Sequence, residues 1–181
     1  MSNRGERESQ RIYQFQLFSD LALDVRTNTQ TAITVARLER SLNRRYIKEV
    51  RTNITSPEDA IRYFRENIYT PFDACVQEEF WVLMLNTKNV VTHQAMIYRG
   101  TNTTMIVRAA EVFRPAIETN ATAIILGHNH PSGSVEVSPE DVQTTRSLVE
   151  AGQLLGIEVL DHILVGAETC NSLRERGLGF P

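Results

Sequence analysis

Hydrophobic and polar residues follow two different periodicities along the chain. From about residue 19 to residue 50, apolar positions recur at loosely helical spacing, which predicts a mostly helical N-terminal segment. Short apolar runs beyond residue 76 predict strands at 79–86, 90–98, 103–107, 121–127 and 157–165. Capping residues and helical spacing predict helices at 56–67, at 108–120, and from Ser138 to Gly152 or Gly156. We expect Pro115 to kink the second of these helices or to end its first half.

The order of these elements predicts the fold class. The strand at 79–86 is apolar on both faces, as in the middle of a sheet, and a short turn joins it to an antiparallel partner. No glycine-rich phosphate loop follows any predicted strand, which argues against a doubly wound nucleotide-binding fold. We therefore predict an α/β fold with a mixed central β-sheet flanked by helices. The predicted organisation is a largely helical accessory segment, 1–55, and a domain over 56–181.

Composition excludes several classes of protein. The chain has 181 residues, of which 41% are hydrophobic and 23% charged, so it is neither a disordered chain nor a fibrous rod. The longest apolar run, Phe80 to Leu85, is far shorter than the roughly 20 residues that span a bilayer. No signal peptide is visible at the N-terminus, and the two cysteines are far apart. We expect a cytoplasmic protein with no membrane partner and with reduced thiols.

Charge is distributed unevenly. Residues 1–51 hold ten lysines and arginines against six acidic residues, and the remainder holds nine against sixteen. A basic segment can contact nucleic acid or the acidic remainder of its own chain. The residues that would contact DNA are Arg37, Arg40, Arg44, Arg45 and Lys48.

The residues with a chemical signature follow the predicted strand 121–127. His128 and His130 are two positions apart, so in extended backbone both imidazoles project to one side. Asp141 falls in the first turn of the next predicted helix, beginning after Ser138. Two imidazoles and one carboxylate are a usual protein ligand set for catalytic zinc. The combination predicts a metal site.

The chain contains an internal control for this motif. The tetrapeptide Ser-Pro-Glu-Asp occurs at 56–59 and again at 138–141. The first copy has no histidine nearby and needs no role beyond capping a helix. Chemistry is therefore indicated only by the second copy together with His128 and His130.

The spacing H-x-H, seven residues, S-x-x-D resembles that of the JAMM (MPN-type) metalloproteases, and HNHPSG resembles their RadC-like branch. The resemblance covers roughly residues 76–175. It implies a layered sandwich like that of cytidine deaminases and one Zn²⁺ per chain, bound by His128, His130 and Asp141. It also implies that Ser138 stabilises an oxyanion or orients the attacking water while capping its helix.

The resemblance further implies an upstream glutamate as general base, and two candidates are adjacent. Alternation along a strand places Glu78 and Glu79 on opposite faces, so only one can reach the metal. The match to Q-E-x-F favours Glu78. Asp161-His162 in the last predicted strand also fits the family, either as a partner that orients a ligand imidazole or as a buried structural pair.

The function that these residues predict is zinc-dependent hydrolysis of a peptide or isopeptide-like amide, with a protein or peptide as substrate. The alternatives are a DNA-associated RadC-like factor, with or without nuclease activity, and a non-catalytic scaffold domain. Residues 1–55 lack the helix-hairpin-helix signature of longer RadC-like proteins, so DNA binding is not carried over from the resemblance. The sequence identifies neither the substrate nor the oligomeric state.

Overall fold

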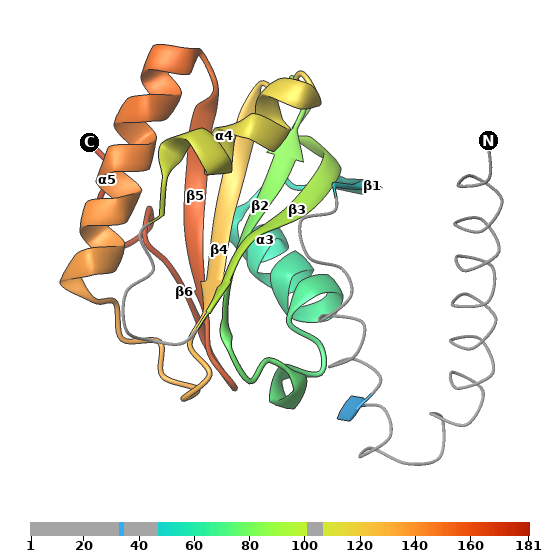
Figure 1. Ribbon diagram of the computed structural model, residues 1–181, viewed down its shortest axis with the longest axis vertical. Coiled ribbons are helices and arrows are strands. Elements are labelled where there is room, and N and C mark those ends of the chain that lie inside the picture. Colours follow the sequence, from blue (N-terminus) through green and yellow to red (C-terminus); the bar gives the residue numbers. More distant parts are fainter. Residues whose placement is uncertain (1–32, 35–46, 101–106) are drawn as a thin grey trace, which may run out of the picture. The chain divides into compact units, whose positions relative to one another are not determined.

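A six-stranded sheet forms the centre of the structure (Figure 1). The structure is a computed structural model, which describes residues 33–34, 47–100 and 107–181. The chain divides into two compact units, residues 1–42 and 43–181, and the sheet belongs to the second. The strands are β1 (Lys48–Asn53), β2 (Glu78–Leu85), β3 (Val90–Gly100), β4 (Ala123–Asn129), β5 (Glu158–Val165) and β6 (Cys170–Ser172). The helices are α3 (Pro57–Tyr63), η2 (Phe64–Ile68), η3 (Phe72–Ala74), α4 (Ala109–Glu118) and α5 (Pro139–Leu155).

The sheet is mixed, with strand order β1-β3-β2-β4-β5-β6. Its neighbours pair antiparallel except β4 and β5, which are parallel and are joined by the crossover that contains α5. That helix ends at Gly156, whose φ of 69° is the left-handed conformation that favours glycine. This topology places β4 in the middle of the sheet, with the start of α5 following it along the chain.

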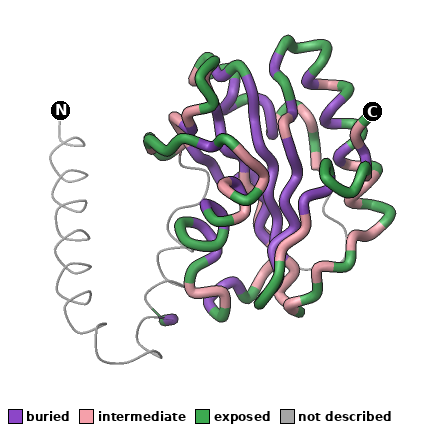
Figure 2. The backbone as a smooth tube through the Cα atoms, turned by 180° about the vertical axis from the view of Figure 1, so that it is seen from behind, coloured by how far each residue is buried: buried purple, intermediate pink, exposed green. Residues whose placement is uncertain are grey.

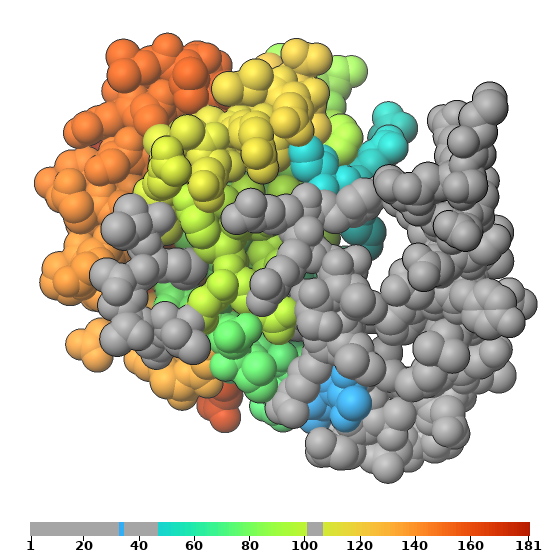
Figure 3. Space-filling model, in the orientation of Figure 1, coloured from blue at the N-terminus to red at the C-terminus, as the bar shows by residue number. Residues whose placement is uncertain are grey.

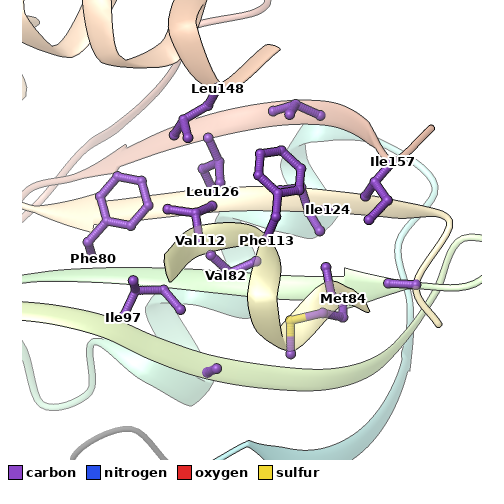
Figure 4. Close-up of a cluster of buried hydrophobic side chains, with 14 of the residues drawn as sticks. Phe80, Val82, Met84, Ile97, Val112, Phe113, Ile124, Leu126, Leu148 and Ile157 are labelled. Atoms are coloured by element: carbon purple, nitrogen blue, oxygen red, sulfur yellow. The ribbon is translucent and has the colours of Figure 1, made fainter. Parts of the chain in front are cut away.

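Helices cover both faces of the sheet. One core cluster lies between the sheet and helices α4 and α5, where Phe80 and Leu126 meet Phe113 and Leu148 (Figure 4). The other cluster joins the opposite face to α3 and η2, with Phe64 at its centre. The central strands β2, β4 and β5 are accordingly the most buried strands of the sheet (Figure 2). Helices α4 and α5 lie side by side at the surface (Figure 3).

Strict alternation along the central strands decides which residues reach each layer. Phe80, Val82, Ile124 and Leu126 face α4 and α5, whereas their neighbours Leu83 and Ile125 face α3. The same alternation continues past the core to the end of β4, where the histidines lie.

The predicted fold class is confirmed, and three details differ. Residues 48–50, expected to be helical, belong to the edge strand β1, which pairs with β3. The helix that begins at Pro57 continues beyond Tyr63 as a turn of π-helix through Ile68. Helix α4 does not end at Pro115, which is buried within it.

Two predictions fall outside the described residues. The strand predicted at 103–107 lies there except for Val107, which is not in a strand. The N-terminal helical segment lies there apart from residues 33–34, which are helical, and 47–55. The domain boundary between residues 55 and 56 therefore stays a prediction. Within the described residues, no helix is both long and apolar enough to cross a membrane.

Candidate metal centre

The two histidines of the motif converge at the end of β4. His128 follows Leu126 on the α5 face of the strand, and His130 comes back to the same side two residues later. Their Nε2 atoms are 3.3 Å apart. His128 is 1% exposed and His130 is partly exposed, so the pair lies at the rim of the core.

The first turn of α5 brings Asp141 to these imidazoles. Ser138 caps the helix: its hydroxyl accepts the amide of Asp141, and Asp141 Oδ2 accepts the Ser138 amide at 2.9 Å. The Ser138 hydroxyl also donates to Oδ2 at 2.7 Å. With Oδ2 held in this way, Oδ1 lies 3.1 Å from His128 Nε2, and Oδ2 is 3.9 Å from His130 Nε2. The capping box thus fixes the orientation of the carboxylate.

The adjacent glutamates at the start of β2 lie in different surroundings. A carboxylate oxygen of Glu78 and one nitrogen from each of His128 and His130 all lie within 4.8 Å of one another. Glu79 is fully buried, accepts a hydrogen bond from Trp81 Nε1 at 2.9 Å, and pairs with Arg99 at 3.5 Å. Of the two candidates, the structure brings Glu78 to the histidines.

Asn129 holds Glu78 in place from between the two histidines. Its side chain points away from them and bonds to the backbone on either side of Glu78. Oδ1 accepts the amide of Glu79 at 2.8 Å, and Nδ2 donates to the carbonyl of Gln77 at 3.2 Å. The end of β4 therefore fixes the start of β2.

Burial and neighbouring charges shift the pKa values of His130, Asp141 and Glu78. Burial, with the charge of His128, lowers the pKa of His130 below its ordinary value, although Asp141 opposes the shift. Burial by itself would raise the pKa of Asp141, but hydrogen bonds from His128 and Ser138 outweigh it and hold this pKa well below the usual range. Burial and the charge of Asp141 raise the pKa of Glu78, partly offset by His128. Glu78 is thus the most basic carboxylate of the cluster.

A second layer of residues supports His128. Its Nδ1 is 2.9 Å from Nε2 of His162, and His162 Nδ1 is 2.7 Å from the hydroxyl of Thr145. That hydroxyl also donates to the backbone carbonyl of Asp141 at 2.7 Å. Phe80 packs against both rings, with centroids 6.2 Å from His128 and 5.4 Å from His162.

Asp161 and His162, considered together from the sequence, separate in space. Asp161 accepts hydrogen bonds from the Ser172 hydroxyl and from the amides of His162 and Arg174, which ties β5 to the C-terminal segment. Only His162 contacts a residue of the metal motif. Asp161 therefore connects β5 to the C-terminal segment, whereas His162 lies against His128.

The donor set fits a zinc ion. His128, His130 and Asp141 offer two imidazole nitrogens and a carboxylate at one point, and Glu78 lies beside them. All five residues chosen from the sequence therefore gather at one site, Ser138 through its bonds to Asp141. Thr145 also lies behind the site and was not among the predicted residues, although its position four residues after Asp141 on one helix face was a usable signal.

Comparison with known proteins identifies the family of the chain. Residues 54–178 match the RadC-like JAB domain. The chain is 45% identical over 139 residues to a UPF0758 protein of Bacillus cereus strain G9842, covering 75% of this chain and 60% of the relative. It is 46% identical over 136 residues to a UPF0758 protein of Staphylococcus carnosus strain TM300, covering 74% and 58%. The chain thus spans about three fifths of the length of these relatives. It belongs to the RadC-like JAB domain family, within the JAMM (MPN-type) superfamily that its metal motif resembles.

Proposed function

We propose that this chain is a zinc-dependent hydrolase that cleaves a peptide or isopeptide-like amide bond in a protein or peptide. The observation that supports it best is the convergence of His128, His130, Asp141 and Glu78 at the ends of β2 and β4. Zinc bound by the first three would activate a water molecule and polarise the substrate carbonyl.

Glu78 is the proposed proton carrier. Its raised pKa makes it a better base than an ordinary glutamate, and it lies beside the imidazoles on the same face of the sheet. It would accept the proton of the attacking water and return it to the nitrogen of the leaving amine. The pairing of Glu79 with Arg99 keeps the neighbouring carboxylate out of this role.

Ser138 is the proposed donor to the developing oxyanion. Its hydroxyl proton is directed to Asp141 Oδ2, so a donation to substrate would require a rotation of the hydroxyl. In the resting geometry it orients the carboxylate, and both actions can belong to one residue.

We also propose that the protein is located in the cytoplasm. Cys75 and Cys170 are both free thiols, which suits a reducing compartment.

Of the five basic residues named for DNA, only Lys48 lies in the described chain, where it is exposed on the edge strand β1.

The test combines metal content with cleavage. Plasma mass spectrometry of purified wild type should find about one zinc per chain, and His128→Ala and Asp141→Ala should lose it. Zinc-loaded wild type should cleave members of a quenched fluorogenic peptide library, or of a matching library joined through the lysine ε-amino group. Glu78→Gln should keep the zinc and lose the cleavage, whereas Glu140→Gln, an exposed carboxylate of the same motif, should keep both.

Two results would overturn the proposal. One is a wild-type protein that takes up no zinc after reconstitution. The other is a zinc-loaded Glu78→Gln protein that cleaves as fast as wild type.

A further inference from the structure

Three hydrogen bonds connect one proposed metal ligand to another behind the site. They run from His128 Nδ1 to His162 Nε2 at 2.9 Å, from His162 Nδ1 to Thr145 Oγ1 at 2.7 Å, and from Thr145 Oγ1 to the carbonyl of Asp141 at 2.7 Å. Each member is deeply buried: His128 and His162 are 1% exposed and Thr145 is 0% exposed. Water is therefore excluded from the chain of bonds.

The direction of all three hydrogen bonds follows from the final acceptor, which is the carbonyl oxygen of Asp141. A carbonyl oxygen can only accept, so the single hydroxyl proton of Thr145 is committed to Asp141. The hydroxyl oxygen must then accept from His162 Nδ1–H, which leaves His162 Nε2 with a lone pair. That lone pair accepts from His128 Nδ1–H. The opposite direction would leave two oxygens 2.7 Å apart with no proton between them.

We propose that Thr145 and His162 are positioning residues that keep a proton on Nδ1 of His128 and so direct its Nε2 toward the metal. The imidazole faces Asp141 and His130 through Nε2, so with Nδ1 held by His162 a bound metal would replace the proton that Nε2 shares with Asp141. A ligand histidine usually donates its other nitrogen to a carboxylate or carbonyl. In this chain a second imidazole takes that place and passes the constraint to the backbone of α5.

The connection also makes the two ligands depend on one another. Thr145 lies one turn after Asp141 in α5, and its hydroxyl bonds to the carbonyl of that same residue. Phe80 packs against both imidazole rings and limits their rotation. A change at Thr145 should therefore reach His128 without touching any proposed ligand side chain.

This inference rests on the metal site of the proposed function, but one measurement is independent of metal and of activity. The chain has four histidines. Single substitutions of His93 and His130 identify the ring signals of these two in ¹⁵N-histidine spectra, and the remaining signals belong to His128 and His162. In metal-free wild type, we expect His128 and His162 both to carry a proton on Nδ1. A scalar coupling between His128 Nδ1 and His162 Nε2 should report the bond that joins them. A proton on His162 Nε2 would overturn the proposal.

The second measurement uses a matched pair of variants. Thr145→Ser keeps the hydroxyl and should retain wild-type tautomers and zinc affinity. Thr145→Val keeps the shape, removes the hydroxyl, and should weaken zinc binding about 10-fold to 100-fold in a chelator competition. Circular dichroism checks that both variants fold.

The two proposals fail in different ways. Tight zinc binding by wild type and equally tight binding by folded Thr145→Val would overturn the positioning role while leaving the hydrolase standing. A wild type that binds no zinc would overturn the hydrolase, and the metal-free spectra would still decide the tautomer.

Discussion

The two copies of Ser-Pro-Glu-Asp begin helices on opposite faces of the same sheet. Both perform the local task that their sequence predicts: Ser56 caps α3 and Ser138 caps α5, each by accepting the amide of its aspartate. They differ in what the aspartate meets. Asp59 bonds to Thr55 and Arg62 at the surface, whereas Asp141 bonds to Ser138 and faces His128.

This difference shows that the tetrapeptide supplies a helix start and an oriented carboxylate, and no chemistry by itself. The strand that leads to α5 is β4, which carries His128 near its end and is followed directly by His130. In α3, no histidine lies near the cap in the sequence. The function of the motif therefore depends on which strand leads into it.

The largest contrast should come from the aspartates. Asp141→Asn should lower zinc affinity by at least about 100-fold, because it removes a charged ligand. Asp59→Asn, the same change in the same tetrapeptide, should leave zinc affinity unchanged. Isothermal titration of zinc into both folded variants measures the contrast. Equal affinities would show that the second copy is also only a cap.

The two faces of the sheet also meet at β4. Gly127 precedes His128 and lies directly against the Phe64 ring, so a Cβ at this position would overlap that ring. Gly127→Ala should therefore destabilise the metal-free protein by about 1–3 kcal/mol. Phe64→Leu in the same chain should recover part of the loss. Urea unfolding of the two single variants and the double variant checks this, and simple additivity of their effects would contradict it.

Removal of each capping hydroxyl gives a smaller and more even effect. Ser56→Ala and Ser138→Ala should each cost about 1 kcal/mol of unfolding free energy in metal-free protein. Only Ser138→Ala should also weaken zinc binding, because only Ser138 orients a ligand carboxylate. Thermal unfolding with and without zinc separates the two effects. A zinc defect in Ser56→Ala would refute the distinction.

The smallest effect should appear in the acid stability of the metal-free protein. The pKa of Asp141 is lowered on folding, so its carboxylate stabilises the fold above its ordinary pKa. This stabilisation is lost as pH falls through the lowered value. The stability difference between wild type and Asp141→Asn should therefore narrow between about pH 5 and pH 2. A difference that stayed constant in urea titrations across this range would show that Asp141 is not the group responsible.

The parts of the molecule that follow from local rules could be read from the sequence. Alternation in a strand depends only on positions in the sequence, so it placed Glu78 and Glu79 on opposite faces and His128 and His130 on one side. Capping depends on four consecutive residues, so both helix starts were predicted. The fold class followed from the order of such elements.

The remainder depends on contacts that are distant in sequence or lack a hydrophobic signal. Strand β1 is polar and mostly exposed, so nothing in its pattern distinguishes it from a loop until β3 pairs with it. The bond between His128 and His162 joins residues 34 positions apart. The π-helical turn at Phe64–Ile68 has no local signature among its five residues.

The hydrogen bonds between Asn129 and the start of β2 have a consequence for amide exchange. Two glutamates in succession would let a one-residue slip of β2 present a carboxylate to the histidines in either register. The bond from the Glu79 amide to Asn129 Oδ1 selects one register and covers a fully buried proton. That proton should exchange with deuterium only when the whole domain opens. In Asn129→Ala, the Glu79 amide should exchange faster, at the rate of an amide at a frayed strand end.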